Sequence, residues 1–227
     1  MNDIRIGVLG ASGRMGQAII SEISNHENCT AVGATQNDDL NALFEKCHVV
    51  VDFTNPEPLK NHLEIATKTK TPLLVGTTGL SQDRHDLIEN AAKNIPLIYA
   101  SNTSLGVNIL LDAVKKTAAK LGDDFVVEIV DKHHKHKIDA PSGTAVSFAK
   151  AIEVGRDVKG QDIAYSITRE GEIAGEHTVT FKNQSEEISF THKAFDRKLF
   201  AKGAVTAALW LKDKKSGLYS MNDVLGL

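Results

Sequence analysis

The sequence predicts an α/β protein in which a Rossmann-like, doubly wound parallel sheet is followed by a second, α+β domain with a mixed or mostly antiparallel sheet. Three observations support this prediction. Short apolar runs alternate with helical periodicity five times near the start of the chain, which is typical of a parallel sheet covered by helices. A glycine-rich turn joins the first run to the first helix, as in dinucleotide-binding folds. Beyond residue 104 the strands follow one another with short polar links, which favours antiparallel pairing.

The composition fits a globular chain with room for two domains. It has 227 residues, 41% of them hydrophobic, and a formal net charge of -3. We predict a first domain over residues 1–103 and a second over residues 104–204, with the tail of residues 205–227 returning to the first. The acidic balance argues against nucleic acid as a partner, and no apolar run reaches the roughly 18 residues that a membrane span needs. Cys29 and Cys47 are isolated in the sequence, which fits a reducing cytoplasm.

The first strand, predicted over residues 4–10, leads into the turn Gly10-Ala11-Ser12-Gly13-Arg14-Met15-Gly16 and then into an apolar-periodic helix. The spacing Gly-x-x-Gly-x-x-Gly is a variant of the dinucleotide fingerprint. Its glycines permit a tight turn and a close approach of the backbone to a pyrophosphate. Arg14 could add a cation to the phosphate site.

The second strand, predicted over residues 30–36, ends in Gln36-Asn37-Asp38-Asp39, where such a fold reads the ribose. A carboxylate accepts a hydrogen bond from a ribose 2′-hydroxyl, whereas a 2′-phosphate needs a cation. No Arg or Lys occurs between Arg14 and Lys46, so the local charge favours NADH over NADPH. The alternative is that one of these polar residues caps the next helix.

Three more strands are predicted over residues 49–54, 71–79 and 95–102, each with a polar exit. Ligands of open α/β sheets bind at the carboxyl ends of strands. Phe53 and Thr54 are therefore predicted to flank a nicotinamide. The other two exits are Gly76-Thr77-Thr78 and Ala100-Ser101-Asn102-Thr103.

The second domain is predicted to open with a long helix closed by Gly122, followed by a strand over residues 125–130. A helix then begins at Ser142 or Gly143. Three further strand-like runs, at residues 164–169, 177–181 and 187–192, are expected to pair antiparallel in sequence order. A last helix is expected over residues 204–211.

The segment Lys132-His133-His134-Lys135-His136-Lys137 mixes amines that are cationic at pH 7 with imidazoles that titrate near it. The start of the following helix is an anion site in its own right, so the combination suits acid/base chemistry on an anion. A solvated surface run, a nucleic-acid patch and a metal cluster are the alternatives; the acidic net charge and the lack of paired cysteine spacing weigh against the last two. A strand would send His134 and His136 to one face and the other members to the opposite face, unless a turn follows.

Taken together, these motifs resemble the dihydrodipicolinate reductase family, formally 4-hydroxy-tetrahydrodipicolinate reductases. The most specific match is the stretch of residues 128–145, and residues 171–177 and 208–211 add to it. The resemblance implies reduction of 4-hydroxy-tetrahydrodipicolinate to tetrahydrodipicolinate in the diaminopimelate route of lysine biosynthesis. It also implies a cytoplasmic homotetramer, NADH or NADPH as cofactor, a dinucleotide-binding domain over residues 1–103, and a substrate-binding and oligomerisation domain over residues 104–204.

Residue by residue, the resemblance makes His133 the general acid and Lys137 a second proton donor. The substrate carboxylates would be bound by His134, Ser142, Gly143 and Thr144. The pyrophosphate would be held by Gly10, Ala11, Ser12, Gly13, Arg14 and Met15. The nicotinamide side would be lined by Gly76, Thr77, Thr78, Ala100, Ser101, Asn102 and Thr103. No metal is implied. The sequence departs from the family pattern at the ribose, where Asn37 replaces the usual acidic residue and Asp38 replaces a basic one.

Two other functions remain open on sequence alone. A different nicotinamide oxidoreductase would account for the glycine turn but not for the histidine and lysine segment. A non-catalytic NADH sensor would use that segment to bind an effector. Substrate-dependent oxidation of NADH separates an enzyme from a sensor, and conjugated imine acids tested against keto acids separate the two kinds of oxidoreductase.

Overall fold

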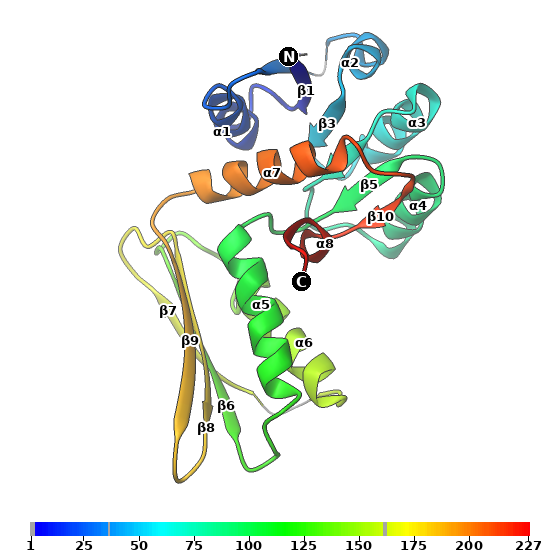
Figure 1. Cartoon of the computed structure of the whole chain (residues 1–227). Helices are drawn as coiled ribbons and strands as arrows, with labels where there is room; N and C mark the ends of the chain where they lie inside the picture. Colours follow the sequence, from blue (N-terminus) through cyan, green and yellow to red (C-terminus); the bar gives the residue numbers. More distant parts are fainter. Residues whose placement is uncertain (1–2, 36, 161–162) are drawn as a thin grey trace. The chain divides into compact units, whose positions relative to one another are not determined.

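The computed structural model describes residues 3–35, 37–160 and 163–227. The chain divides into two compact units, which Figure 1 shows together. Unit 1 contains Met1–Leu105 and Lys198–Gly226, and unit 2 contains Gly106–Arg197 with Leu227. The return to unit 1 therefore comes before the whole of helix α7 (Lys198–Leu211), whereas the sequence placed it near residue 205.

Unit 1 is built on a six-stranded sheet in which every pairing is parallel. Its strands, in sheet order, are β10 (Gly217–Tyr219), β5 (Pro96–Tyr99), β4 (Leu73–Val75), β3 (Val49–Asp52), β1 (Ile4–Leu9) and β2 (Cys29–Ala34). The chain runs from β1 to β2 on one side and then to β3 on the other. The sheet thus reverses its winding at β1, where open α/β sheets bind ligands.

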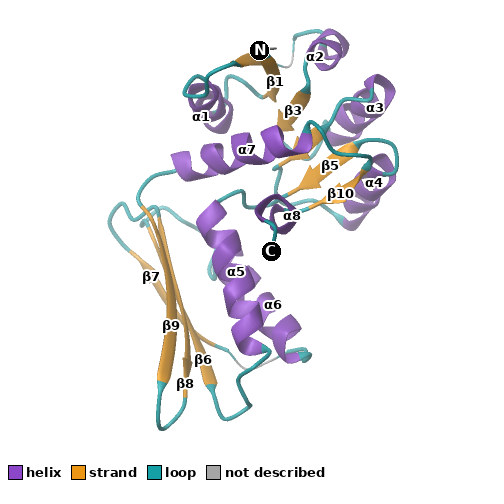
Figure 2. Ribbon diagram, viewed as in Figure 1, coloured by secondary structure: helices purple, strands orange, loops and turns teal. Residues whose placement is uncertain are grey.

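Helices cover both faces of this sheet, as Figure 2 shows. One face packs against α1 (Arg14–Ile23), α7 and α8 (Met221–Leu225), and the other against α2 (Leu40–Lys46), α3 (Leu59–Thr69) and α4 (Gln82–Ala92). Val49 and Val51 are buried on the first side, and Val50 is buried on the second. Strands that are apolar on both faces need helices on both sides, and the predicted doubly wound parallel sheet is confirmed.

Helix α7 packs very closely on unit 1. A Cβ atom added to Gly203 would lie 1.7 Å from the backbone oxygen of Thr103. The Thr103 hydroxyl donates a hydrogen bond of 2.8 Å to the Phe200 carbonyl. Small residues on this helix, including Ala204, Ala207 and Ala208, are fully buried. This segment is therefore part of the unit 1 core.

Unit 2 has a mixed four-stranded sheet with two helices on one face. Its elements are α5 (Leu105–Ala118), whose first residue belongs to unit 1, β6 (Val126–His133), α6 (Gly143–Arg156), β7 (Ala164–Arg169), β8 (Gly175–Lys182) and β9 (Glu187–Ala194). The sheet order is β7-β6-β8-β9. The predicted α+β domain with a mixed sheet is confirmed.

The expected pairing of β7 with β8 is wrong. Strand β7 pairs in parallel with β6, and β8 takes the other edge of β6 in antiparallel orientation. The reason is the α6 crossover, since a strand that follows a helical connection returns parallel to its predecessor. The sixth strand of unit 1, β10, was not predicted, because its three residues do not lie in an apolar run like the one that marks the equally short β4.

Strand β6 combines core packing with chemistry on a single face. Val127 and Ile129 point into the core beneath α5 and α6. Because successive side chains alternate, Asp131 and His133 continue the same buried face. Among the described residues, no helix is long and apolar enough to cross a membrane.

Candidate active site

The histidine and lysine segment begins at the end of a strand and continues into a turn. Strand β6 ends at His133, and the Lys137 backbone N–H donates to the His134 carbonyl at 3.1 Å. His133 is buried, His134 and Lys137 are half-buried, and Lys135 and His136 are exposed. The alternation expected of a continued strand is therefore broken by the turn.

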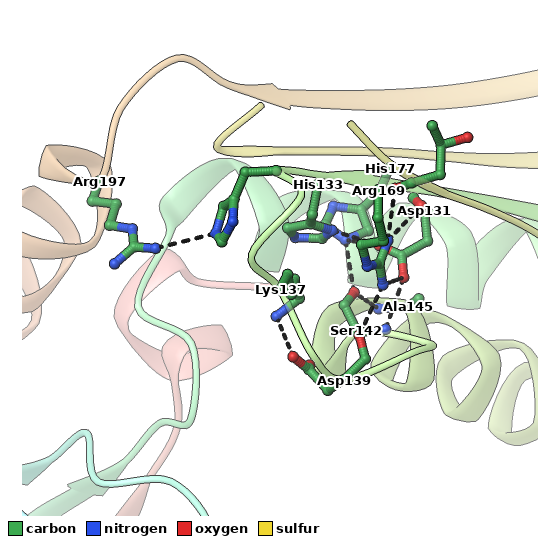
Figure 3. Close-up of polar contacts among 11 residues, drawn as sticks. Asp131, His133, Lys137, Asp139, Ser142, Ala145, Arg169, His177 and Arg197 are labelled. Carbon is green, nitrogen blue, oxygen red and sulfur yellow. Dashed lines mark hydrogen bonds and ion pairs between the residues drawn. The ribbon is translucent and has the colours of Figure 1, made fainter. Parts of the chain in front are cut away.

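Asp131 is the centre of the buried polar network in Figure 3. One carboxylate oxygen, Oδ1, lies 2.8 Å from His133 Nδ1 and 3.3 Å from His177 Nε2. The other, Oδ2, accepts hydrogen bonds from the Ser142 backbone N–H at 2.8 Å and from Arg169 Nη2 at 2.9 Å. Arg169 also donates to the Asp139 carbonyl at 2.9 Å, so the network reaches the loop that enters α6.

The network holds the Asp131 carboxylate ionised. Burial alone would raise the pKa of Asp131, but hydrogen bonds from Ser142 and Arg169 and the charge of His133 outweigh it and leave the pKa below its usual value. A buried carboxylate keeps its charge only when such partners replace its hydration.

The environment of His133 lowers its pKa. Burial is the largest cause and the charges of Lys137 and Arg169 act the same way, whereas Asp131 raises the pKa. The sequence suggested an imidazole that titrates near pH 7, but in the free protein its pKa falls below the ordinary 6.5. An anion bound beside the ring would favour its protonated form and raise the pKa again.

Ser142 and His177 are buried under the first turn of α6. The Ser142 hydroxyl accepts the Ala145 N–H at 3.2 Å as the N-cap of α6, and it lies 3.0 Å from His177 Nε2. Its backbone N–H donates a hydrogen bond to Asp131 Oδ2. Burial lowers the pKa of His177 to about 4, so this imidazole is neutral at pH 7. Ser142 thus serves the fold of the site, and its polar groups are already engaged.

Lys137 and Asp139 form an ion pair of 2.8 Å before α6. The pKa of Asp139 is lowered first by the hydrogen bond from Lys137, and backbone N–H groups of Asp139 itself and of Gly143 act in the same direction. Gly143 is exposed and Thr144 half-buried at the helix start. His134 Nε2 lies 3.4 Å from Arg197. Lys137, Asp139 and Gly143 are therefore neighbours, whereas His134 makes its contact with Arg197 and Ser142 faces inward.

Asp131, Arg169, His177 and Arg197 were missed by the sequence reasoning. Asp131 gave a signal, because a residue two positions before His133 on a strand shares its face, and His177 ends the segment 171–177 that adds to the family resemblance. Arg169, His177 and Arg197 lie far away in sequence and come together through strand pairing and a loop.

Asp131, His133 and His177 also lie close enough to ligate a metal ion, since their ligand atoms fall within 4.8 Å of one another. The guanidinium of Arg169 already contacts the carboxylate, and the charge of Lys137 also acts on His133. A divalent cation would be repelled by both. The charges here favour an anion beside the cluster.

The glycine turn of unit 1 has the shape of a phosphate cradle. Gly10 has φ +69, a conformation that glycine adopts without strain. A Cβ on Gly16 would lie 2.2 Å from the Gly10 carbonyl oxygen, so α1 packs directly on the turn. No side chain caps α1 at Gly13. Ser12 and Arg14 are exposed, Ala11 is buried, and Met15 is partly buried.

The exits of β1, β3 and β4 meet at one edge of the sheet. A Cβ on Gly10 would lie 3.0 Å from Thr54 Cγ2, and one on Gly76 would lie 2.3 Å from the Phe53 ring. The Thr77 hydroxyl donates to the Thr54 carbonyl at 3.1 Å. The predicted cofactor residues of these exits are therefore brought together.

The remaining exit, after β5, is only partly accessible. Ser101 is exposed and Asn102 half-buried, whereas Ala100 and Thr103 are buried. The Thr103 hydroxyl is bonded to the Phe200 carbonyl under α7. Thr78, on the β4 exit, is exposed.

The predicted ribose readers lie after β2, and Gln36 beside them falls outside the described residues. Asn37 and Asp38 are exposed. Asp38 Oδ2 accepts from the Thr35 N–H at 2.7 Å and from its hydroxyl at 2.8 Å, bonds that lower the pKa of Asp38. Asp39 caps α2 by accepting from the Ala42 N–H, as the capping alternative allowed. The stretch offers carboxylates and no cation.

Two family models match almost the whole chain. One is described as dihydrodipicolinate reductase, N-terminus, and matches residues 4–103; the other is described as dihydrodipicolinate reductase, C-terminus, and matches residues 106–225. The chain belongs to the dihydrodipicolinate reductase family. The resemblance inferred from the sequence is thereby confirmed.

Relatives within the dihydrodipicolinate reductase family match along their full length. The 4-hydroxy-tetrahydrodipicolinate reductase of Zymomonas mobilis subsp. mobilis is 42% identical over 250 residues, covering 100% of this chain and 98% of its own. That of Pseudoalteromonas atlantica is 39% identical over 264 residues, covering 98% and 99%. The structure of a dipicolinate-bound dihydrodipicolinate reductase from Paenisporosarcina sp. TG-14 has a TM-score of 0.80 at 22% identity, covering 97% and 98%, which shows the shared fold.

Proposed function

We propose that the protein reduces 4-hydroxy-tetrahydrodipicolinate to tetrahydrodipicolinate in the diaminopimelate route of lysine biosynthesis, in the cytoplasm. The observation that carries this proposal is the site at the end of β6. There a buried imidazole, His133, lies between a carboxylate and two cations. Membership of the reductase family across both halves of the chain supports it.

The cofactor of this reaction is a nicotinamide dinucleotide, which when bound supplies hydride to the substrate. The residues of unit 1 fit such a group, because the left-handed Gly10 and the uncapped start of α1 leave room and N–H donors for a pyrophosphate. Gly10 through Met15 would hold the phosphates. The nicotinamide would be bordered by Phe53, Thr54 and residues 76–78 and 100–102. Thr103 is buried next to this segment.

In unit 2, the chain supplies charge and protons. The substrate is a conjugated cyclic imine with two carboxylates. Lys137, His134 and the N–H groups at Gly143 and Thr144 would hold those carboxylates by charge-assisted bonds. His133 would give a proton from its ring to the electron density that reduction builds, and Lys137 would serve as a second donor. General acid catalysis of this kind typically contributes about 10²- to 10⁴-fold.

A single assay with a panel of substrates tests this function. Oxidation of NADH is followed at 340 nm with 4-hydroxy-tetrahydrodipicolinate, with other conjugated imine acids and with keto acids. We expect turnover with the dicarboxylate imine alone. Failure of that substrate together with turnover of a keto acid would assign the protein to another oxidoreductase reaction, and binding of NADH without any turnover would make it a sensor.

We further propose a modest preference for NADH over NADPH in kcat/KM. A 2′-phosphate near Asp38 and Asp39 would meet like charges, each worth roughly 1 kcal/mol at the surface before salt screening. Asp38→Arg should shift the preference toward NADPH, mostly through KM. The conservative variant Asp38→Asn, which removes the charge without reversing it, is the matched control and should fall between the two. Tighter binding of NADPH than NADH by the unmodified protein would contradict the proposal.

We also propose that unit 1 binds the dinucleotide and that unit 2 binds substrate and forms a homotetramer. The sheet face of unit 2 opposite α5 and α6 supports the second part, because none of the described helices of unit 2 packs on it and Val126, which lies on that face, is 68% exposed. Light scattering should give four chains per particle. Val126→Lys should lower that number, and a monomeric wild-type protein would contradict the assembly while leaving the activity open.

A further inference from the structure

The position of Asp131 suggests a role beyond charge balance. Asp131 is fully buried and lies two residues before His133 on β6, on the same face of the strand. Its two oxygens serve different parts of the site. Oδ1 faces the imidazoles of His133 and His177, and Oδ2 faces the start of α6 and Arg169.

We infer that Asp131 is a positioning residue for the proposed reduction: its carboxylate faces Nδ1 of His133, so that the ring presents Nε2 as the atom that gives the proton. This inference rests on the proposed function. It deepens that function by assigning the two ring nitrogens different tasks.

The geometry around the ring supports this assignment. His133 Nδ1 is 2.8 Å from Asp131 Oδ1, and the carboxylate can only accept a hydrogen bond. The proton on Nδ1 is thereby retained when the imidazolium loses its other proton. On the far side of the ring, Nε2 lies over Gly175, where an added Cβ would come within 3.1 Å of it. Glycine at this position places no Cβ against that nitrogen, whereas any other residue would crowd it.

The contact between Nδ1 and Oδ1 is short but bent, since neither atom makes a hydrogen bond of good geometry. Hydrogen bonds at catalytic groups are often misaligned in free enzymes and tighten when substrate binds. Burial also prevents water from replacing either partner, because Asp131 is fully buried and the His133 side chain is only 10% exposed.

The charged groups around His133 come from four segments. Asp131 lies on β6, Lys137 in the turn after it, Arg169 on β7 and His177 on β8. Lys137 and Arg169 lower the pKa of His133, and Asp131 raises it. His177 is neutral at pH 7, with a pKa of about 4. Among these groups Asp131 alone favours the protonated ring that a general acid needs.

The same carboxylate fixes the anion-binding end of the site. Its Oδ2 accepts the Ser142 N–H at the N-cap of α6, and Arg169 joins it to the loop carrying Asp139. The acid and the helix start that would hold a substrate carboxylate are thus held by one group. This second role predicts an effect on binding that is smaller than the effect on turnover, because α6 is also capped by the Ser142 hydroxyl.

The test compares Asp131→Asn with the wild type and with Asp124→Asn, which makes the same chemical change at an exposed carboxylate that accepts a hydrogen bond from Asn183. We expect Asp131→Asn to lower kcat at least tenfold, to change the dissociation constant of dipicolinate less than fivefold, and to shift the falling limb of kcat/KM to lower pH. Side-chain ¹⁵N NMR of the wild type should show neutral His133 with its proton on Nδ1. Asp124→Asn should match the wild type in each readout.

Each outcome decides between the alternatives. A wild type that does not turn over the imine rejects the proposed function, whatever the variant does. An active wild type with unchanged kcat and pH profile in Asp131→Asn rejects the positioning role alone. If the variant does not fold, the NMR result on the wild type still decides: a proton on Nε2 of neutral His133 overturns the inference, and a proton on Nδ1 upholds it.

Discussion

The ammonium of Lys137 lies 2.8 Å from the carboxylate of Asp139, in the loop that enters α6. The N–H of Gly143 acts on the same carboxylate. An internal anion therefore occupies the groups that would receive a substrate carboxylate. Because Asp139 is more than half exposed, water and salt screen this pair, and it contributes little to stability.

This pair gives the first prediction. Asp139→Asn should bind dipicolinate up to about fivefold more tightly, because a like charge worth at most roughly 1 kcal/mol is removed from beside the ligand. Titration calorimetry at low and high salt measures the gain, which should shrink with salt. Weaker binding would mean that Asp139 is needed to hold Lys137 in place.

His133→Ala should lower kcat on the order of 10²-fold or more, because the developing negative charge loses its acid. Lys137→Ala should in addition raise KM, since one cation serves both the proton and the carboxylate. Steady-state kinetics, with thermal melting as a check on folding, measure these effects. A His133→Ala enzyme with near-normal kcat would remove His133 from the role of acid.

The pH dependence follows from the lowered pKa of His133. An acid must be protonated, so kcat/KM should decline as pH rises through a pKa below the ordinary 6.5. In the complex the dianionic substrate raises that pKa, and kcat should decline at a higher pH than kcat/KM does. In Lys137→Met, which removes a charge that lowers the pKa, the kcat/KM limb should move to higher pH. If wild-type kcat/KM, wild-type kcat and kcat/KM of Lys137→Met all declined at the same pH, His133 would not be the acid.

His177 predicts a loss of stability in mild acid. Its folded-state pKa of about 4 lies below the ordinary 6.5, so between these values the unfolded chain binds a proton that the folded chain does not. The contribution of the neutral ring is intact above about pH 6.5 and is lost as pH falls toward 4. The loss should be on the order of 1 to 3 kcal/mol. Melting curves against pH should be flatter in His177→Gln than in the wild type.

The purified protein should contain no stoichiometric zinc, although Asp131, His133 and His177 have the spacing of metal ligands. The positive charges of Arg169 and Lys137 would repel a divalent cation, and the Asp131 carboxylate already forms an ion pair with Arg169. Elemental analysis measures the metal content. About one zinc per chain in the wild type, lost in Asp131→Asn, would show that these residues form a metal site.

The sequence was most informative where a single local segment determines the outcome. The apolar strands of unit 1, the turn at Gly10 and the segment at His133 are each contiguous, and periodicity or motif spacing predicts them directly. Ser142 was placed correctly at the helix start. Its inward orientation was not foreseen, because it depends on Asp131 taking its N–H.

The partners of His133 could not be predicted, because they depend on strand register. Arg169 lies beside His133 through the parallel pairing of β6 with β7. His177 lies beside Asp131 through the antiparallel pairing of β6 with β8. Pairing β7 with β8, as the short link suggested, would have placed Arg169 away from the imidazole. A choice between two edges of one strand thus decides the composition of the site.

Unit 1 is made from both ends of the chain, with α7 supplied by residues after Lys198. Its buried Ala204, Val205 and Leu211 fill one of the two cores of that unit. During synthesis, residues 1–105 therefore emerge with one face of their sheet covered only by α1, while unit 2, which is almost continuous, can close as soon as β9 is made. The part of the protein that the ribosome makes first is the last to complete its fold, and a chain broken off before α7 would expose that apolar face.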